Sequence, residues 1–130
     1  MILGIGTDIV GVIRVRNGLE RHGERFARRI LGPGEMTEFM SSKRQAHFLA
    51  KRFAAKEALV KALGTGFRGG IRLSDIQITH DDRGKPTLEC SGKTALLLQQ
   101  LGVTASHVSL ADEHDYAVAI VVLDADGSKA

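Results

Sequence analysis

The stretch from Arg52 to Gly66 reads RFAAKEALVKALGTG, and the rest of the chain can be placed around it. Alanine and leucine dominate this stretch, and both are strong helix formers. Gly64 suits the position just past a helix end, and Lys61 in the last turn favours the same boundary. Apolar residues upstream continue the helical spacing. The pattern therefore predicts a long helix over about 44–63.

The flanking sequence alternates between strand and helix patterns. Residues 2–10 predict a strand, and residues 13–30 predict helical pieces broken near Gly18 and Gly23. Another helix is expected to begin near Glu35. Further along, the sequence predicts strands at 75–80, 86–90, 107–111 and 116–123, a helix at 92–101, and a frayed tail at 125–130. This order indicates one α+β domain over residues 1–130, in which an antiparallel sheet packs on the long helix.

Composition limits the class of protein. The chain has 130 residues, of which 43% are hydrophobic and 25% charged, as is typical of a soluble globular domain. No apolar run approaches the ~18 residues of a membrane helix, and the N-terminus lacks the basic start of a signal peptide. Cys90 is the only cysteine, so it cannot form a disulfide within the chain. We therefore expect a cytoplasmic protein with no membrane association.

A carboxylate stands in the first predicted strand. Gly4, Gly6, Asp8 and Val10 would share one face of that strand, so the bare backbone of two glycines lies beside Asp8. Glycines in a strand often mark the close approach of another backbone or a ligand. A packing accommodation, with Asp8 capping the next segment, is the commoner explanation. However, a carboxylate on an apolar strand is unfavourable unless it is paired or binds a metal.

Glu57 and Lys61 are spaced i, i+4 and lie on one face of the predicted helix. Most such pairs are surface ion pairs that contribute about 0.3–0.5 kcal/mol. A second interpretation requires that the fold bring Asp8 close to Glu57. The two carboxylates could then bind Mg²⁺, which usually takes one or two carboxylates together with water and substrate phosphates. Lys61 would neutralise phosphate charge beside them, and these groups together would serve phosphoryl transfer.

Basic residues are concentrated near the N-terminus. The net charge is only +3, but six arginines lie between Arg14 and Arg29. Such a run is usually a solvated helix face. Alternatively, it docks an acidic partner. Nucleic acid is poorly supported, because Phe26 is the only aromatic residue in this segment and the chain has no tryptophan for base stacking.

Two motifs resemble those of a known family. GIGTDIV at 4–10 and RFAAKEALVKALGTG at 52–66 are similar to the signature motifs of the holo-acyl-carrier-protein synthases, small bacterial 4′-phosphopantetheinyl transferases. The resemblance extends to RFARRIL at 25–31, GKP at 84–86 and HVSLADEHDYAVAIVVL at 107–123, and so spans nearly the whole chain. It implies that the protein moves the phosphopantetheine arm of coenzyme A to a serine of apo acyl carrier protein. Adenosine 3′,5′-bisphosphate is released, and the reaction, which serves fatty acid synthesis, requires Mg²⁺.

The resemblance also implies roles for individual residues. Asp8 and Glu57 would bind the metal, and Lys61 would stabilise charge or donate a proton at the leaving group. The serine proton would pass to a metal-bound water or to a carboxylate, and the resemblance does not choose between them. The residues expected near coenzyme A are Lys43, Arg52, Lys61, Gly64, Gly66, Pro86 and His107.

The same resemblance implies partners and an assembly. The resemblance implies a homotrimer whose active sites are completed at subunit interfaces. Acyl carrier protein is acidic, and the residues expected to receive it are Arg14, Arg25, Phe26 and Arg29. Three departures from the family pattern are Gly11, where an acidic residue is frequent, Val60, where a serine is frequent, and an extra glycine in LGPGE at 31–35.

Two other interpretations remain open. The chain could be a basic module that docks nucleic acid or an acidic protein without chemistry, which leaves Asp8 beside the glycines unexplained. It could also be a degenerate family member that binds but does not turn over, which the presence of Asp8, Glu57 and Lys61 disfavours. Dependence on a divalent metal and binding of coenzyme A would separate these interpretations.

Overall fold

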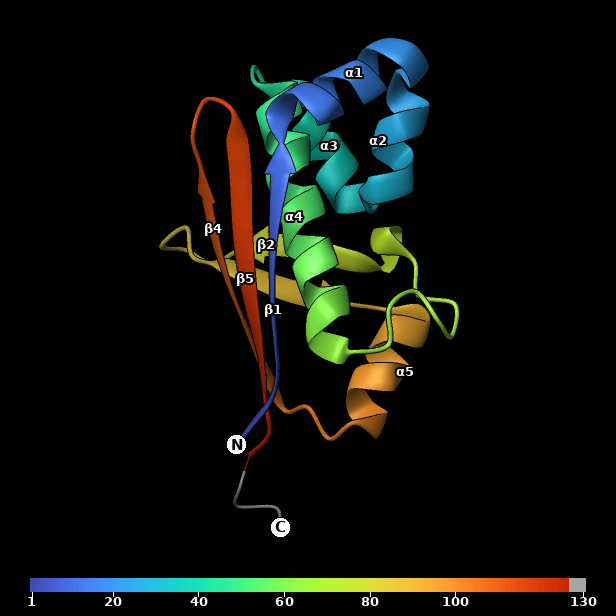
Figure 1. Cartoon of the computed structure of the whole chain (residues 1–130), viewed down its shortest axis with the longest axis vertical. Helices are drawn as coiled ribbons and strands as arrows, with labels where there is room; N and C mark the ends of the chain where they lie inside the picture. Colours follow the sequence, from blue (N-terminus) through green and yellow to red (C-terminus); the bar gives the residue numbers. More distant parts are fainter. Residues whose placement is uncertain (127–130) are drawn as a thin grey trace.

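A long helix lies against one face of a three-stranded sheet in the computed structural model, which describes residues 1–126 (Figure 1). The helix is α4, Gln45–Leu63. The strands are β1 (Ile2–Gly11), β5 (Tyr116–Asp124) and β4 (Ala105–Asp112), in the antiparallel order β1-β5-β4. Most of the core lies between this sheet and α4, where side chains such as Leu59 and Val121 are fully buried.

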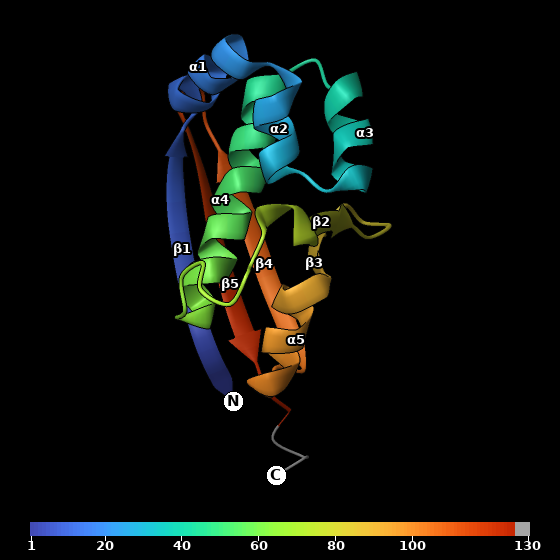
Figure 2. The same cartoon turned by 90° about the vertical axis from the view of Figure 1, so that its right-hand side faces the viewer.

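Short elements cover the remaining sides of α4. Figure 2 shows α1 (Val12–His22), α2 (Glu24–Ile30) and α3 (Pro33–Ser41) at one end of the molecule, around the first half of α4. A second antiparallel sheet contains β2 (Ile76–His80) and β3 (Pro86–Cys90), preceded by a 3₁₀ turn at Leu73–Asp75. Helix α5 (Gly92–Gln100) lies at the opposite end, near both termini.

Two glycines let β1 contact the backbone of α4. A Cβ atom at Gly6 would overlap the carbonyl oxygen of Ala58, and one at Gly4 would overlap that of Ala62. Any larger residue would therefore push the strand away from the helix. Of the two possibilities that the strand glycines raised, another backbone or a ligand, the structure shows a backbone, which belongs to α4.

The predicted fold class is confirmed, with two differences in detail. The strands form two sheets, because β2 and β3 hydrogen-bond only to each other among the described strands. Gly18 does not break a helix: α1 runs through it, and a Cβ there would overlap the ring of Phe26. Gly23 does separate α1 from α2, with a φ of 60°.

The chain ends and helix ends follow simple rules. Gly64 ends α4 in the left-handed conformation that the sequence predicts, with a φ of 76°. In the tail predicted to fray, the Ala125 amide donates to the Met1 carbonyl at 2.8 Å, so the described part of this segment is bonded. Residues 127–130 lie outside the described part of the chain. None of the helices in residues 1–126 is both long and apolar enough to span a lipid bilayer.

Candidate active site

Asp8 and Lys61 meet where β1 packs on α4. Along β1, Gly6 and Val10 are buried and Asp8 lies between them on the same face, so its side chain points to the helix. Lys61 Nζ donates to Asp8 Oδ1 at 2.9 Å and to the Thr7 carbonyl oxygen at 3.0 Å. The Asp8 side chain keeps 17% of its surface exposed and that of Lys61 55%, so the pair lies at an open edge of the molecule.

Glu57 joins this pair as a second carboxylate. Partial burial raises the pKa of Glu57, and the negative charge of Asp8 raises it further. The positive charges of Lys61 and Arg14 act in the opposite direction on the same pKa. The fold therefore brings Asp8, Glu57 and Lys61 together, as the metal-site interpretation requires.

The expected surface ion pair is absent. Among the ion pairs of the described residues, Lys61 binds Asp8 of the strand and not Glu57 of its own helix. Within residues 1–126, Glu57 consequently has no cation in salt-bridge contact, although it lies close enough to Asp8 for the two charges to repel. The interpretation of Glu57 and Lys61 as an ordinary i, i+4 pair is wrong.

The two carboxylates fit a hard divalent cation. A cation placed between Asp8 and Glu57 would remove the repulsion that raises the pKa of Glu57. Residues 1–126 contain no cluster of three or more His, Cys, Asp or Glu side chains that could hold a metal. Two carboxylates alone match Mg²⁺, which completes its shell with water and substrate phosphates, better than a metal that needs a full protein cage.

Arg52 lies in a buried ion cluster and not at this open edge. Its side chain is 5% exposed, and its guanidinium contacts Glu35 and Glu38, each at 3.1 Å. It also lies over the ring of Phe48, with 4.4 Å between Cζ and the ring centroid. These contacts within the chain take up the guanidinium of Arg52. Its contact with coenzyme A stays a prediction.

The other residues predicted to bind coenzyme A lie on several elements. Gly64 and Gly66 belong to the loop after α4 and have positive φ angles of 76° and 60°. Lys43 is exposed between α3 and α4, and Pro86 begins β3. His107 is exposed on β4, where its neighbour Val108 is buried.

His107 and Asp8 lie on opposite faces of the same sheet. Asp8 points to α4, whereas His107 aligns with Val122 and, through it, with the exposed Ile5 on the outer face. Within one copy of the chain, the side chains of Asp8 and His107 therefore point away from each other, to opposite sides of the sheet.

The arginine-rich segment forms two small features. Arg25, Phe26 and Arg29 line a hollow of about 270 Å³ together with His22. Arg14 lies apart from it, with its Cζ 5.7 Å from the ring centroid of Phe53 on α4. Phe53 precedes Glu57 by one helical turn, so Arg14 lies close enough to the carboxylate site for its charge to act on Glu57.

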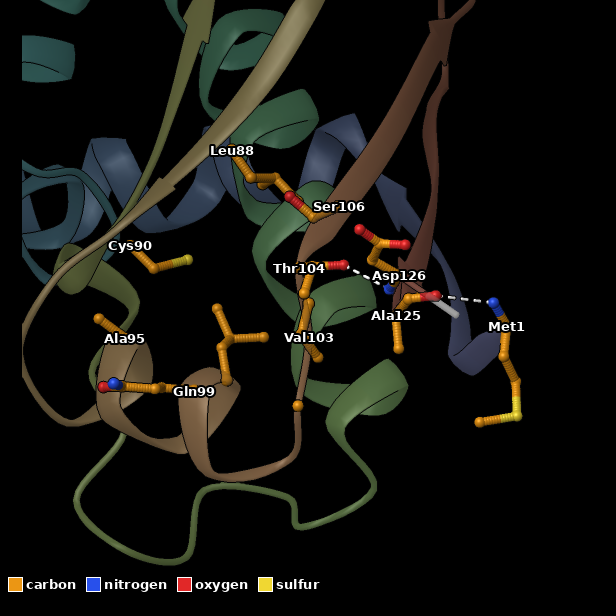
Figure 3. Close-up of a pocket in the computed structure, with 12 residues that line it drawn as sticks. Met1, Leu88, Cys90, Ala95, Gln99, Val103, Thr104, Ser106, Ala125 and Asp126 are labelled. Atoms are coloured by element: carbon orange, nitrogen blue, oxygen red, sulfur yellow. Dashed lines mark hydrogen bonds between the residues drawn. The ribbon is translucent and has the colours of Figure 1, made fainter. Parts of the chain in front are cut away.

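A separate apolar pocket lies at the far end of the molecule. Figure 3 shows this pocket of about 650 Å³ between α5, β3 and the start of β4, with Leu88, Cys90 and Val103 in its wall. Burial raises the pKa of the Cys90 thiol to about 11, so the thiol stays protonated and is a poor nucleophile. None of Asp8, Glu57 and Lys61 lines this pocket.

The sequence analysis missed the buried cluster around Glu35. Lys56 is fully buried and its Nζ contacts Glu35 Oε1 at 2.5 Å. Burial lowers the pKa of Lys56, while the charge of Glu35 acts in the opposite direction. One signal was available: Arg52 and Lys56 continue the three- and four-residue spacing of Leu49, Leu59 and Leu63, which places both on the apolar face of the helix.

Comparison with known proteins identifies the family. The model of the 4′-phosphopantetheinyl transferase superfamily matches residues 4–121. A holo-[acyl-carrier-protein] synthase of Halorhodospira halophila is 55% identical over 95% of this chain and 98% of its own. The crystal structure of the synthase from Neisseria meningitidis has a TM-score of 0.90 and 43% identity, covering 95% of this chain and 99% of the other.

A third relative was solved with a ligand. The holo-(acyl-carrier-protein) synthase of Bacillus anthracis, in complex with CoA (3′,5′-ADP), has a TM-score of 0.81 and 38% identity. It covers 97% of this chain and 99% of its own. With the Asp8, Glu57 and Lys61 constellation in place, these matches establish that the chain belongs to the 4′-phosphopantetheinyl transferase superfamily, among the holo-[acyl-carrier-protein] synthases.

Proposed function

We propose that this protein transfers the 4′-phosphopantetheine group of coenzyme A to a serine hydroxyl of apo acyl carrier protein, for fatty acid synthesis. Relatives that cover nearly the whole chain are named holo-[acyl-carrier-protein] synthase, and one was solved with coenzyme A. The observation that carries the proposal is the meeting of Asp8 and Lys61, from distant parts of the chain, beside Glu57.

Each residue of the site has a defined task in this reaction. Asp8 and Glu57 would hold Mg²⁺, which when bound would supply Lewis-acid polarisation of the coenzyme A pyrophosphate. The serine oxygen forms a bond to the β-phosphorus while the bond to adenosine 3′,5′-bisphosphate breaks, and the serine proton passes to a carboxylate or to a water molecule. Lys61 Nζ, held beside Asp8 at 2.9 Å, stabilises the charge that develops on the leaving phosphate or protonates it.

A complete coenzyme A site requires two copies of the chain. Asp8 and Glu57 lie on the helix side of the sheet, and His107 lies on the outer side. If His107 contacts the nucleotide as the family resemblance implies, it reaches the nucleotide from a neighbouring copy, and Pro86 is a further proposed contact to the same substrate. Lys43, Gly64 and Gly66 are proposed contacts to the same substrate, and Arg52 would join them only if it left its present partners.

The outer face of the sheet supports self-association. Its exposed apolar side chains include Ile5 (62% exposed), Ile9 (61%) and Ile120 (40%). Contiguous apolar surface of this kind usually marks an interface. Three copies related by a closed rotation would bury these faces against one another, in agreement with the homotrimer implied by the resemblance.

The basic helices are the proposed docking surface for the acidic carrier protein. Arg25, Arg29 and Phe26 provide charge and an apolar ring around one hollow, and Arg14 lies over Phe53 and acts on the pKa of Glu57. Carrier protein and coenzyme A are intracellular metabolic partners, so a cytoplasmic location is part of the proposal.

Intact mass measurement tests this function. Apo acyl carrier protein is incubated with the protein and coenzyme A, in parallel with Mg²⁺ and with EDTA. We expect a gain of about 340 Da, one phosphopantetheine arm, only with Mg²⁺. No gain from folded protein that binds coenzyme A would indicate the wrong acceptor or an inactive member. No gain and no binding would contradict the proposal.

A further inference from the structure

Helix α4 is held by a buried ion cluster centred on Glu35. Glu35 is 1% exposed, and its Oε1 accepts from Lys56 Nζ and from the Gly32 amide, the latter at 2.9 Å. Its Oε2 accepts from Arg52 Nη1 and the Ile78 amide, both at 3.1 Å. One carboxylate therefore joins the start of α3, strand β2 and two turns of α4.

The cations of the cluster extend these connections. Lys56 Nζ also donates to the carbonyl oxygens of Ile30, at 2.5 Å, and Leu73, at 3.0 Å. Arg52 Nη1 donates to the Ile78 carbonyl oxygen at 2.9 Å. All three amine protons of Lys56 thus have acceptors, as a fully buried ammonium requires.

The cluster lies on a different side of α4 from the contact with β1. Successive helix residues differ by about 100° around the axis, so Ala58, which touches Gly6, lies about 200° from Lys56. Glu57 lies about 100° and Lys61 about 140° from Lys56, between the two contacts. Turning α4 about its axis would break the Glu35 contacts on one side or close backbone packing on the other.

We propose that Glu35, Arg52 and Lys56 are positioning residues for the transferase reaction: their cluster sets the rotation of α4 against β1 so that Glu57 and Lys61 face Asp8. The inference rests on the proposed function for its catalytic consequence only. In this proposal Arg52 helps to position α4 and does not itself contact the substrate, in agreement with the contacts that occupy its guanidinium.

Substitution Lys56→Met tests this role. It keeps an apolar stem of similar length and removes the ammonium. The matched control is Leu98→Ala, which removes a partly buried side chain from α5, outside both the cluster and the contact between β1 and α4. Both proteins are studied at a temperature at which circular dichroism shows them folded, and wild type is measured in parallel.

Two readouts are compared. NMR contacts between the Hα protons of Gly4 and Gly6 and the backbone of α4 report the rotation of the helix without reference to activity. Steady-state kinetics and Mn²⁺ binding report the site. For Lys56→Met we expect altered helix–strand contacts, weaker Mn²⁺ binding, and a fall in kcat of about 100-fold, since small displacements of catalytic groups have effects of that size. KM for the carrier protein should stay near the wild-type value, and the control should behave as wild type.

Every outcome bears on the proposal. Wild-type contacts and kcat in folded Lys56→Met overturn it, as does an equal loss of kcat in the control. If Lys56→Met does not fold, Glu35→Gln, which keeps the shape and an acceptor oxygen, is measured in its place with the same expectations. If wild type itself transfers nothing, the proposed function fails, and the NMR contacts still decide whether the cluster sets the rotation of α4.

Discussion

At the scale of single residues, the position of one lysine changes the interpretation of the site. Lys61 binds Asp8, so Glu57 faces the Asp8 carboxylate without a salt bridge of its own among the described residues. Two carboxylates in this arrangement repel unless a cation lies between them. A cation placed between Asp8 and Glu57 would relieve this repulsion, which is why we propose a divalent ion at this site.

Removal of the Glu57 charge should abolish transfer. Glu57→Gln keeps the size of the side chain and removes the raised-pKa carboxyl, so the fold should be retained while Mg²⁺ binding and turnover fall by at least about 100-fold. Intact-mass kinetics measure the loss. Glu89→Gln, on β3, is the control and should keep wild-type rates; a folded Glu57→Gln protein with wild-type turnover would rule out the metal assignment.

The titration of Glu57 should respond to its neighbours with a defined sign. Asp8→Asn removes the like charge, so the pKa of Glu57 should fall toward its ordinary value; Arg14→Gln removes an opposite charge, so the pKa should rise. Carboxyl ¹³C NMR of the metal-free protein measures both shifts. Asp81→Asn is the control, because Asp81 takes no part in the electrostatics of Glu57. Shifts in the reverse directions would contradict the placement of these charges.

The chemistry of these residues could be expected from the sequence, but their contacts could not. Residue types and spacing identified Asp8, Glu57 and Lys61 as a possible set. Which cation binds which carboxylate depends on the approach of Asp8 to Lys61, which are 53 residues apart in the chain, and no local pattern contains that information. The burial of Lys56 was missed for the same reason, since its acceptors come from three distant segments.

At the scale of elements, the contact between β1 and α4 is made by backbone. Gly6→Ala should lower the free energy of unfolding by roughly 2–3 kcal/mol, because its methyl group would overlap the Ala58 carbonyl and backbone cannot yield as a side chain can. Thermal or urea unfolding measures the loss. Gly11→Ala, in the same strand and with open space around its Cβ, should change stability little; equal losses in both would contradict this account.

The basic helices make a second prediction at this scale. Charge reversal by Arg25→Glu, at the hollow of α2, should raise KM for the carrier protein far more than KM for coenzyme A. Arg14→Glu should do the same and should also affect kcat, because Arg14 acts on Glu57. Steady-state kinetics with each substrate varied in turn separate the effects. An equal rise in both KM values for Arg25→Glu would exclude a docking role.

Element boundaries show where local rules suffice. The end of α4 at Gly64 and the break at Gly23 follow from positive φ angles that glycine accepts readily. Gly18 failed as a predicted break because a tertiary contact, the ring of Phe26 against its Cα, favours glycine inside a helix. Helix propensity predicts a break at glycine in both cases. Only the packing around each glycine shows that Gly23 separates two helices and that Gly18 does not.

At the scale of the whole molecule, the sheet separates the proposed site into two halves. Mixed oligomers test this separation. Glu57→Gln and His107→Ala should each be inactive or strongly impaired alone, because each lacks one half of every site. After mixing under conditions that allow subunits to exchange, activity should reappear, since some interfaces combine an intact Glu57 from one copy with an intact His107 from the next.

The control for this experiment mixes two variants of the same half, Glu57→Gln and Asp8→Asn, and should show no recovery. Recovery in the control, or none in the test mixture despite confirmed subunit exchange, would place the complete site within one copy. The sequence could not predict that Asp8 and His107 lie on opposite faces of one sheet, or that the outer face is apolar. Both features depend on the strand order β1-β5-β4, which brings the two ends of the chain together.

The paired glycines of β1 bear on how this protein can be re-engineered. A library that varies the whole strand should accept many residues at positions 3, 5, 7 and 9, which face outward, as far as monomer folding is concerned. Positions 4 and 6 should return glycine alone, because the helix backbone already occupies the space of a first side-chain carbon. Designers who wish to alter the proposed site therefore have little freedom to move Asp8 by changing its strand, and would have to change the residues around it instead.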